Sequence, residues 1–129
     1  MSRPPLPLWM SIEPELSETR LMLTVPPVGA VLRARLPTTP AQPRALGLLL
    51  EGLASWYGRS LCAALDADAS DVQRHPERWA QFLGELDEER IFVEWVATDT
   101  RTGRDRFLGQ VGDFRSARRL LTRAQTGQR

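Results

Sequence analysis

The sequence predicts an α/β fold with three layers, in which helices pack on a mixed sheet. Three observations point to this class. Two alternating segments near the N-terminus, joined by turn residues, predict an antiparallel hairpin or meander. From Thr39 to Val96, apolar helical and strand-like segments then follow one another in turn. One strand-like segment, Ser60 to Leu65, is apolar without alternation, as is typical of a parallel strand covered on both faces.

The predicted hairpin consists of Arg20–Val25 and Val31–Leu36. Apolar and polar side chains alternate with a period of two in both segments. The five residues between them, Pro-Pro-Val-Gly-Ala, have the chemistry of a turn. The preceding residues 1–19 are rich in proline, and two interpretations stay open for Leu6–Ile12. This segment is either an edge strand, where proline is tolerated, or part of a disordered lead-in.

The first long helix is predicted to begin at Thr38, Thr39 and Pro40, which combine a capping hydroxyl with an early proline. It is expected to run to Tyr57 and to stop at Gly58. One side of this helix is predicted to carry a stripe of large, mostly apolar side chains: Leu46, Leu49, Leu50, Leu53 and Tyr57. Leu48 and Trp56 broaden the stripe, so we expect other elements to wrap this helix.

The next strand, Ser60–Leu65, ends at Asp66. A second helix is predicted from His75-Pro76-Glu77, because apolar side chains follow at helical spacing: Trp79, Phe82, Leu83 and Leu86. Ile91–Val96 then alternates as a strand. Its Glu94 needs a partner if both sheet faces are covered, and Arg33 or Arg35 on a neighbouring strand is the expected one.

The remaining chain is predicted to form a polar loop from Asp99 to Asp105 and then a strand or helix start at Arg106–Val111. A terminal helix is expected after Asp113. The whole chain of 129 residues has the size of one domain. We divide it into the lead-in 1–19, a core spanning 20–124 and a frayed tail, 125–129.

Composition excludes several functional classes. Cys62 is the only cysteine and His75 the only histidine, so neither an internal disulfide nor a zinc cluster of these residues is expected. A serine or cysteine triad based on histidine is equally unexpected. No apolar run approaches the roughly eighteen residues of a membrane span. Since the proline-broken N-terminus makes a poor signal peptide, a cytoplasmic location without membrane contact is expected.

The basic residues have an unusual identity and an uneven distribution. All 17 are arginine, which together with abundant Ala, Gly, Leu and Pro indicates a GC-rich prokaryotic genome. Residues 1–100 hold nine arginines and fourteen acids, a net charge of −5, whereas residues 101–129 hold eight arginines and two acids, a net +6. This segment is therefore a predicted contact region for a protein or nucleic acid. Its candidate phosphate-binding residues are Arg115, Arg118, Arg119 and Arg123.

The chain resembles the ribonuclease H-like superfamily over residues 20–124. The resemblance rests on the helix containing Arg44 to Glu51, the strand Cys62-Ala-Ala-Leu-Asp66, and the strand segment Val93-Glu94-Trp95-Val96. In that family, carboxylates hold two Mg²⁺ ions on the scissile phosphate. Only Asp66 matches such a position. Arg44 falls near the position of the family's helix glutamate, and the first strands offer no aspartate.

Three functional hypotheses follow from this pattern. The first is a non-catalytic ribonuclease H-like domain that binds a partner or assists another protein, without a cofactor. The second is a nuclease with a rearranged magnesium site, made from Asp66, Asp68, Asp99 and Asp105. Asp66 and Asp68 also suit a turn between strand and helix, and Asp71 a helix start. The third is a sequence-independent nucleic-acid binder that uses the C-terminal arginines. A thioredoxin-like order is the alternative topology, although it leaves Arg20–Val25 unassigned.

Overall fold

The protein has an α/β fold, as predicted. The computed structural model describes residues 6–88, 92–99 and 104–110, and side chains from residue 6 to residue 82. The described strands are β1 (Leu8–Pro14), β2 (Glu18–Val25), β3 (Gly29–Pro37), β4 (Leu61–Asp66), β5 (Phe92–Asp99) and β6 (Arg104–Gln110). The described helices are α1 (Gln42–Tyr57), α2 (Ser70–Arg74) and α3 (Pro76–Glu88). The predicted terminal helix and tail lie outside these residues.

The first four strands form a mixed sheet in the order β3-β2-β1-β4. β1, β2 and β3 are an antiparallel meander, in which Ile12 pairs with Leu21 and Leu21 with Ala34. β4 then adds to the other side of β1 in parallel, so that Ile12 also pairs with Leu65. β5 continues the sheet parallel to β4, and β6 pairs antiparallel with β5. The predicted combination of a meander with parallel strands is confirmed.

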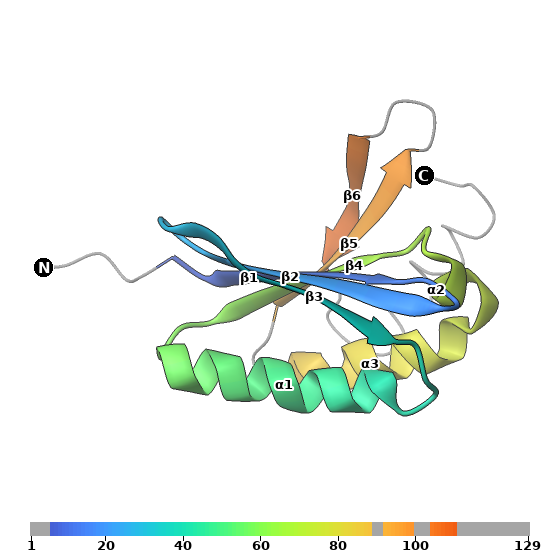
Figure 1. Ribbon diagram of the computed structural model, residues 1–129, viewed down its shortest axis with the longest axis horizontal. Helices are drawn as coiled ribbons and strands as arrows, with labels where there is room; N and C mark the ends of the chain where they lie inside the picture. The colour runs from blue at the N-terminus through green and yellow to red at the C-terminus, as the bar shows by residue number, and fades with distance from the viewer. Residues whose placement is uncertain (1–5, 89–91, 100–103, 111–129) are drawn as a thin grey trace, which may run out of the picture.

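The long helices α1 and α3 lie on the same side of the sheet (Figure 1). The core fills the space between them and the strands, because one face of each strand of the meander is apolar. Its fully buried side chains include Leu8, Met10, Ile12, Leu46, Leu50, Leu61, Leu65, Val72 and Trp79. In the described part of the chain, no long helix covers the opposite side of β1, β2 and β3. The third layer that the sequence predicts is therefore not seen over the meander.

β1 corrects the interpretation of the N-terminal segment. The sequence left it as an edge strand or a disordered lead-in, but Leu8–Pro14 is an interior strand between β2 and β4. The prolines explain why this is allowed. Pro7 precedes the strand and Pro14 is its last residue, so the residues between them keep the backbone N–H groups that two neighbouring strands require.

α1 begins later and is less covered than predicted. Its N-cap is Ala41, and Pro43, rather than Pro40, is the proline of the first turn. The Thr38 hydroxyl instead donates a 2.6 Å hydrogen bond to the Glu15 carbonyl oxygen. The helix ends at Gly58 as predicted, with φ of 65°. Among the described residues, other elements do not wrap this helix, since Trp56 is 80% exposed.

The strands settle two further predictions, of which the first is wrong and the second agrees with one of its two alternatives. Arg33 and Arg35 lie on β3, which is separated from β5 by β2, β1 and β4. They therefore cannot be the cross-strand partners of Glu94. Residues 106–110 of the segment for which a strand or a helix start was predicted belong to strand β6, and Val111 lies outside the described residues.

Candidate binding groove on the sheet

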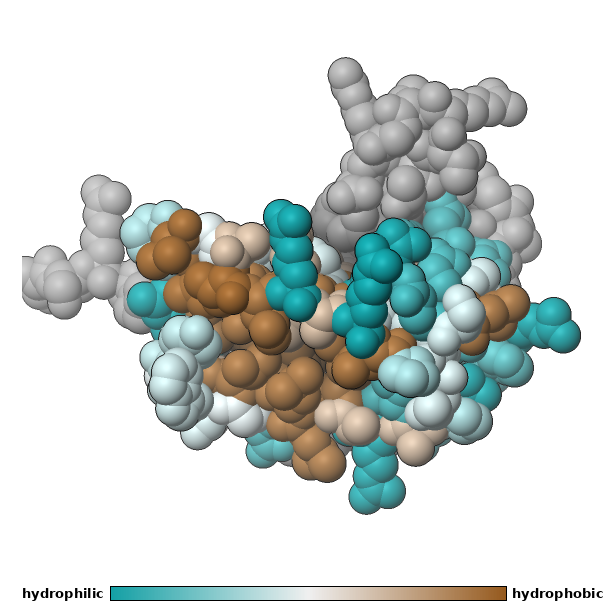
Figure 2. Space-filling model, viewed as in Figure 1, coloured by the Kyte–Doolittle hydropathy of each residue, from teal (hydrophilic) through white to brown (hydrophobic). Residues whose placement is uncertain are grey.

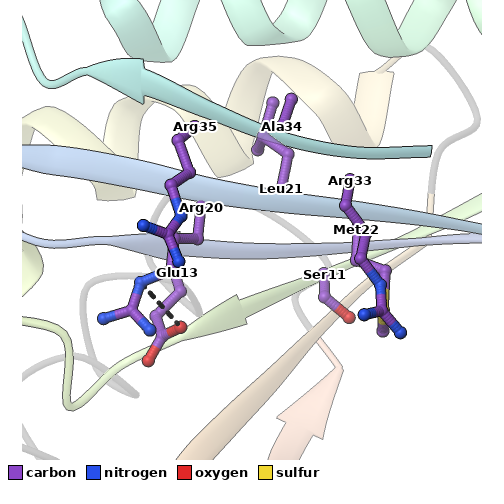
Figure 3. Close-up of a pocket in the computed structure, with 8 residues that line it drawn as sticks. All are labelled: Ser11, Glu13, Arg20, Leu21, Met22, Arg33, Ala34 and Arg35. Atoms are coloured by element: carbon purple, nitrogen blue, oxygen red, sulfur yellow. Dashed lines mark ion pairs between the residues drawn. The ribbon is translucent and has the colours of Figure 1, made fainter.

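The side of the meander that faces away from α1 and α3 carries a groove of about 640 Å³. Two cross-strand rows of side chains form it. Ser11, Met22 and Arg33 are successive partners across β1, β2 and β3, and Glu13, Arg20 and Arg35 are the next row. Figure 3 shows these six side chains on one side of the sheet, whereas Leu21 and Ala34, which complete the lining, point the other way.

The period of two in the strands places these residues together. Leu21 and Leu23 are buried under the helices, so Arg20 and Met22 between them must face the other side. The same rule applies on β3, where Ala34 packs against the core and its neighbours Arg33 and Arg35 are exposed. The register of the meander therefore places the three arginines on this side of the sheet.

Charges in and beside the groove are only partly balanced. The Nε atom of Arg20 lies 3.8 Å from Glu13 Oε2 and 3.9 Å from Glu18 Oε1, and Arg35 Nη1 lies 3.9 Å from the same Glu18 oxygen. These side chains are between 39% and 73% exposed, so each pair stabilises the fold by only about 0.2–1 kcal/mol. Within residues 6–82, Arg33 has no ion-pair partner. Three arginines against two glutamates leave a net charge of +1.

Asp66 and Asp68, which are predicted for a metal site, lie away from the groove at the carboxyl end of β4, and Asp71 follows in α2. Asp66 Oδ1 accepts a 2.9 Å hydrogen bond from the Asp68 backbone N–H, which is the turn role that the sequence predicts for an aspartate here. Asp71 is 3% exposed and accepts a 2.7 Å hydrogen bond from the Trp79 indole N–H. Arg78 Nη1 lies 3.5 Å from the same oxygen, Asp71 Oδ2.

These acids do not make a magnesium site among the described side chains. No three His, Cys, Asp or Glu residues gather there in a way that would hold a metal ion. Asp99 and Asp105 belong to β5 and β6, and their side chains lie outside the described part. Asp66 pairs with Val96, so Asp99 is three residues further along β5, roughly 10 Å at the rise of a strand.

The remaining predicted binding residues, Arg115, Arg118, Arg119 and Arg123, fall outside the described residues. Sequence reasoning missed the groove because it assigned Arg33 and Arg35 to Glu94. The signal was nevertheless present in the alternation of both hairpin strands. Aligning them as an antiparallel pair would have placed Arg20 and Met22 beside Arg35 and Arg33.

A second contact network, also missed, ties the meander to the helices. Glu15 Oε2 accepts hydrogen bonds from the Ser70 N–H (2.9 Å) and hydroxyl (2.5 Å) at the start of α2. Thr19, fully buried, donates its hydroxyl to Gln42 Oε1 at the start of α1 and lies 2.8 Å from the Thr38 hydroxyl. These contacts fix the turn between β1 and β2 against both helix starts.

Comparison with protein-family models, with curated proteins and with solved structures gives no match. None of the described helices is long and apolar enough to span a membrane. The site must therefore be interpreted from its own geometry.

Proposed function

We propose that this protein is a non-catalytic domain of ribonuclease H-like topology that binds an acidic segment of another protein. The observation that carries this proposal is the groove, where Arg33 is exposed without an ion-pair partner within residues 6–82, beside the partly neutralised Arg20 and Arg35. The strand order supports the topology. An antiparallel meander is joined through α1 to a strand parallel to β1. The thioredoxin-like alternative leaves β2 unassigned, although β2 lies at the centre of the meander.

The contacts of the carboxylates favour a binding role over the nuclease alternative. A two-metal site needs several oxygens free to converge on the ions. Here one Asp66 oxygen closes a turn, and Asp71 is buried against Trp79 and Arg78. In the family that this chain resembles, the helix corresponding to α1 would supply a catalytic glutamate. Here α1 carries Arg44, a cation, near that position.

The charge distribution favours an acidic protein segment over nucleic acid. A nucleic-acid site is usually strongly basic, because it must neutralise many phosphates. Glu13 and Glu18 lie among the three arginines and would repel a continuous phosphate backbone. The described lining of the groove also contains no aromatic side chain on which bases would stack. A peptide whose carboxylates are spaced apart fits this mixture of arginines and glutamates better than a nucleic acid does.

The test is binding of fluorescently labelled poly-L-glutamate to the full chain, measured by anisotropy. Arg33→Glu replaces an attraction with a repulsion, and at about 0.2–1 kcal/mol for each exposed pair the change is roughly 0.4–2 kcal/mol. This corresponds to binding roughly 2- to 30-fold weaker. Arg44→Glu, which changes the net charge equally on exposed α1 surface, is the matched control and is expected to have a much smaller effect.

Two outcomes contradict the proposal. Equal losses in Arg33→Glu and Arg44→Glu would show that binding follows net charge rather than the groove. Tighter, Arg33-dependent binding of a length-matched single-stranded oligonucleotide would favour the nucleic-acid alternative instead.

A further inference from the structure

β3 is the edge strand of the sheet beside the groove, and it is long and regular. It is the first strand in the order β3-β2-β1-β4, and its nine residues include proline only at the last position. The one irregularity in its pairing with β2 lies opposite its beginning, between Leu23 and Thr24. This register shift leaves Val31 without a partner on β2, and pairing is regular from Leu32 onward. Leu32 to Leu36 therefore presents a backbone edge of the kind that proteins usually shorten, bend or cover.

The two faces of this edge differ in chemistry. On the groove side, Arg33 and Arg35 stand on β3 in alternate positions. On the helix side, Leu32 and Leu36 remain 44% and 39% exposed, although Ala34 between them packs against the core. An additional strand would meet cations with one set of its side chains and apolar groups with the other.

α1 extends the apolar side of the edge. Arg44 shares a pocket with Arg78 and Phe82, so its flank of α1 faces α3. At 100° for each residue of an α-helix, Leu49 and Trp56 project roughly 120–140° away from Arg44, on the flank that faces away from α3. They are 40% and 80% exposed. We name Leu32, Leu36, Leu49 and Trp56 the apolar shelf. Figure 2 shows a continuous hydrophobic surface where β3 and α1 face the viewer.

From this arrangement we infer that β3 accepts an extended segment of a partner protein as an added strand, in which acidic and apolar residues alternate. The inference rests on the proposed function and specifies its partner. The acids of the segment would face Arg33 and Arg35, and its apolar side chains would cover the shelf. Backbone hydrogen bonds along the edge supply affinity in this mode of recognition, and the alternate side chains supply specificity.

Charge complementarity selects this occupant over a second copy of the chain. Two β3 strands pairing antiparallel about Arg33 would place Arg33 opposite its own copy. Pairing about Ala34 would place Arg33 opposite Arg35 twice. Like charges directly opposite each other destabilise a strand pair. Cations on an exposed edge strand also protect a protein against self-association, because they repel the same strand of a second copy. An acidic segment is attracted by these cations and is not repelled.

The experiment uses the full chain and a labelled peptide with three Val-Glu repeats between soluble Gly-Ser ends. Anisotropy is expected to show binding at least about tenfold tighter than for the same peptide with Val-Lys repeats. In the double variant Arg33→Glu/Arg35→Glu this preference is expected to reverse. Leu49→Asp is expected to weaken binding several-fold, whereas Leu48→Asp, the same change on the outward face of α1, is the matched control.

Backbone methylation separates strand addition from simple charge attraction. Two versions of the Val-Glu peptide carry N-methyl groups on one or the other set of alternate amides. Only one set can face β3, so one version is expected to lose about tenfold or more in affinity while the other binds nearly as before. Equal behaviour of the two versions, with the Arg33 dependence intact, would overturn strand addition and leave the proposed function standing. Equal binding of the Glu and Lys peptides would overturn both.

Discussion

Replacing Asp71 with alanine tests whether the acids beyond β4 are structural. Asp71 is 3% exposed, and Trp79, whose indole N–H donates to it over 2.7 Å, is fully buried. The substitution would leave that N–H without its acceptor, at a cost of about 1–3 kcal/mol. It would also remove the carboxylate 3.5 Å from Arg78, whose side chain is 24% exposed. Because this partner keeps some contact with water, we add only about 1 kcal/mol.

The expected total is therefore about 2–4 kcal/mol of lost unfolding free energy. This loss is measured by urea unfolding, monitored by far-ultraviolet circular dichroism. If the unfolding free energy falls by about 2 kcal/mol for each molar of urea, the midpoint of unfolding should fall by roughly 1–2 M. In a Trp79→Phe background, the indole N–H is already absent. The same Asp71→Ala change should then cost about 1–3 kcal/mol less, because no indole N–H is left unpaired. A loss below about 0.5 kcal/mol in both backgrounds would refute a structural role for Asp71.

Three other predictions follow from described contacts. Gly58→Ala should destabilise the fold by about 1 kcal/mol, because alanine is strained at φ of 65°. Gly52→Ala, in the interior of α1 where an added Cβ meets open space, should instead stabilise the fold by about 0.5–1 kcal/mol. Changes of the opposite sign in urea unfolding would contradict both predictions. Thr19→Val should cost about 1–3 kcal/mol in the same assay by leaving Gln42 Oε1 buried without its donor, and a neutral effect would disprove that bond's importance. The wild-type chain should not cleave DNA, RNA or their hybrid with Mg²⁺ or Mn²⁺; cleavage that disappears in Asp66→Asn would end the non-catalytic proposal.

The fold could be predicted from the sequence where the pattern is local. Alternation in Arg20–Val25 and Val31–Leu36 gave the hairpin, and the uninterrupted apolar run before Asp66 gave β4. These features depend on a period of two or on its absence, which each segment carries by itself. The place of β1 in the middle of the sheet depends on pairing with both β2 and β4. No local signal encodes that, and the prolines around β1 suggested an edge.

The groove was missed for a similar reason. Arg33 and Arg35 were visible as alternating cations, but their neighbours depend on strand order, and β3 proved distant from β5. Exposure of Trp56 was also unpredictable from composition, since a tryptophan on an apolar helix usually belongs to the core. The turn role of Asp66 could be predicted, because a short aspartate side chain bonds its own backbone two residues ahead.

The most direct test of the proposed binding surface is the change in backbone amide NMR shifts of the ¹⁵N-labelled protein when the Val-Glu peptide is added. The largest changes are expected along β3, from Val31 to Leu36, and in the partner row of β2 around Arg20 and Met22. Amides from Asp66 to Ser70, at the end of β4, should change little. Shifts concentrated at the end of β4, with β3 unaffected, would contradict binding at the groove and the sheet edge.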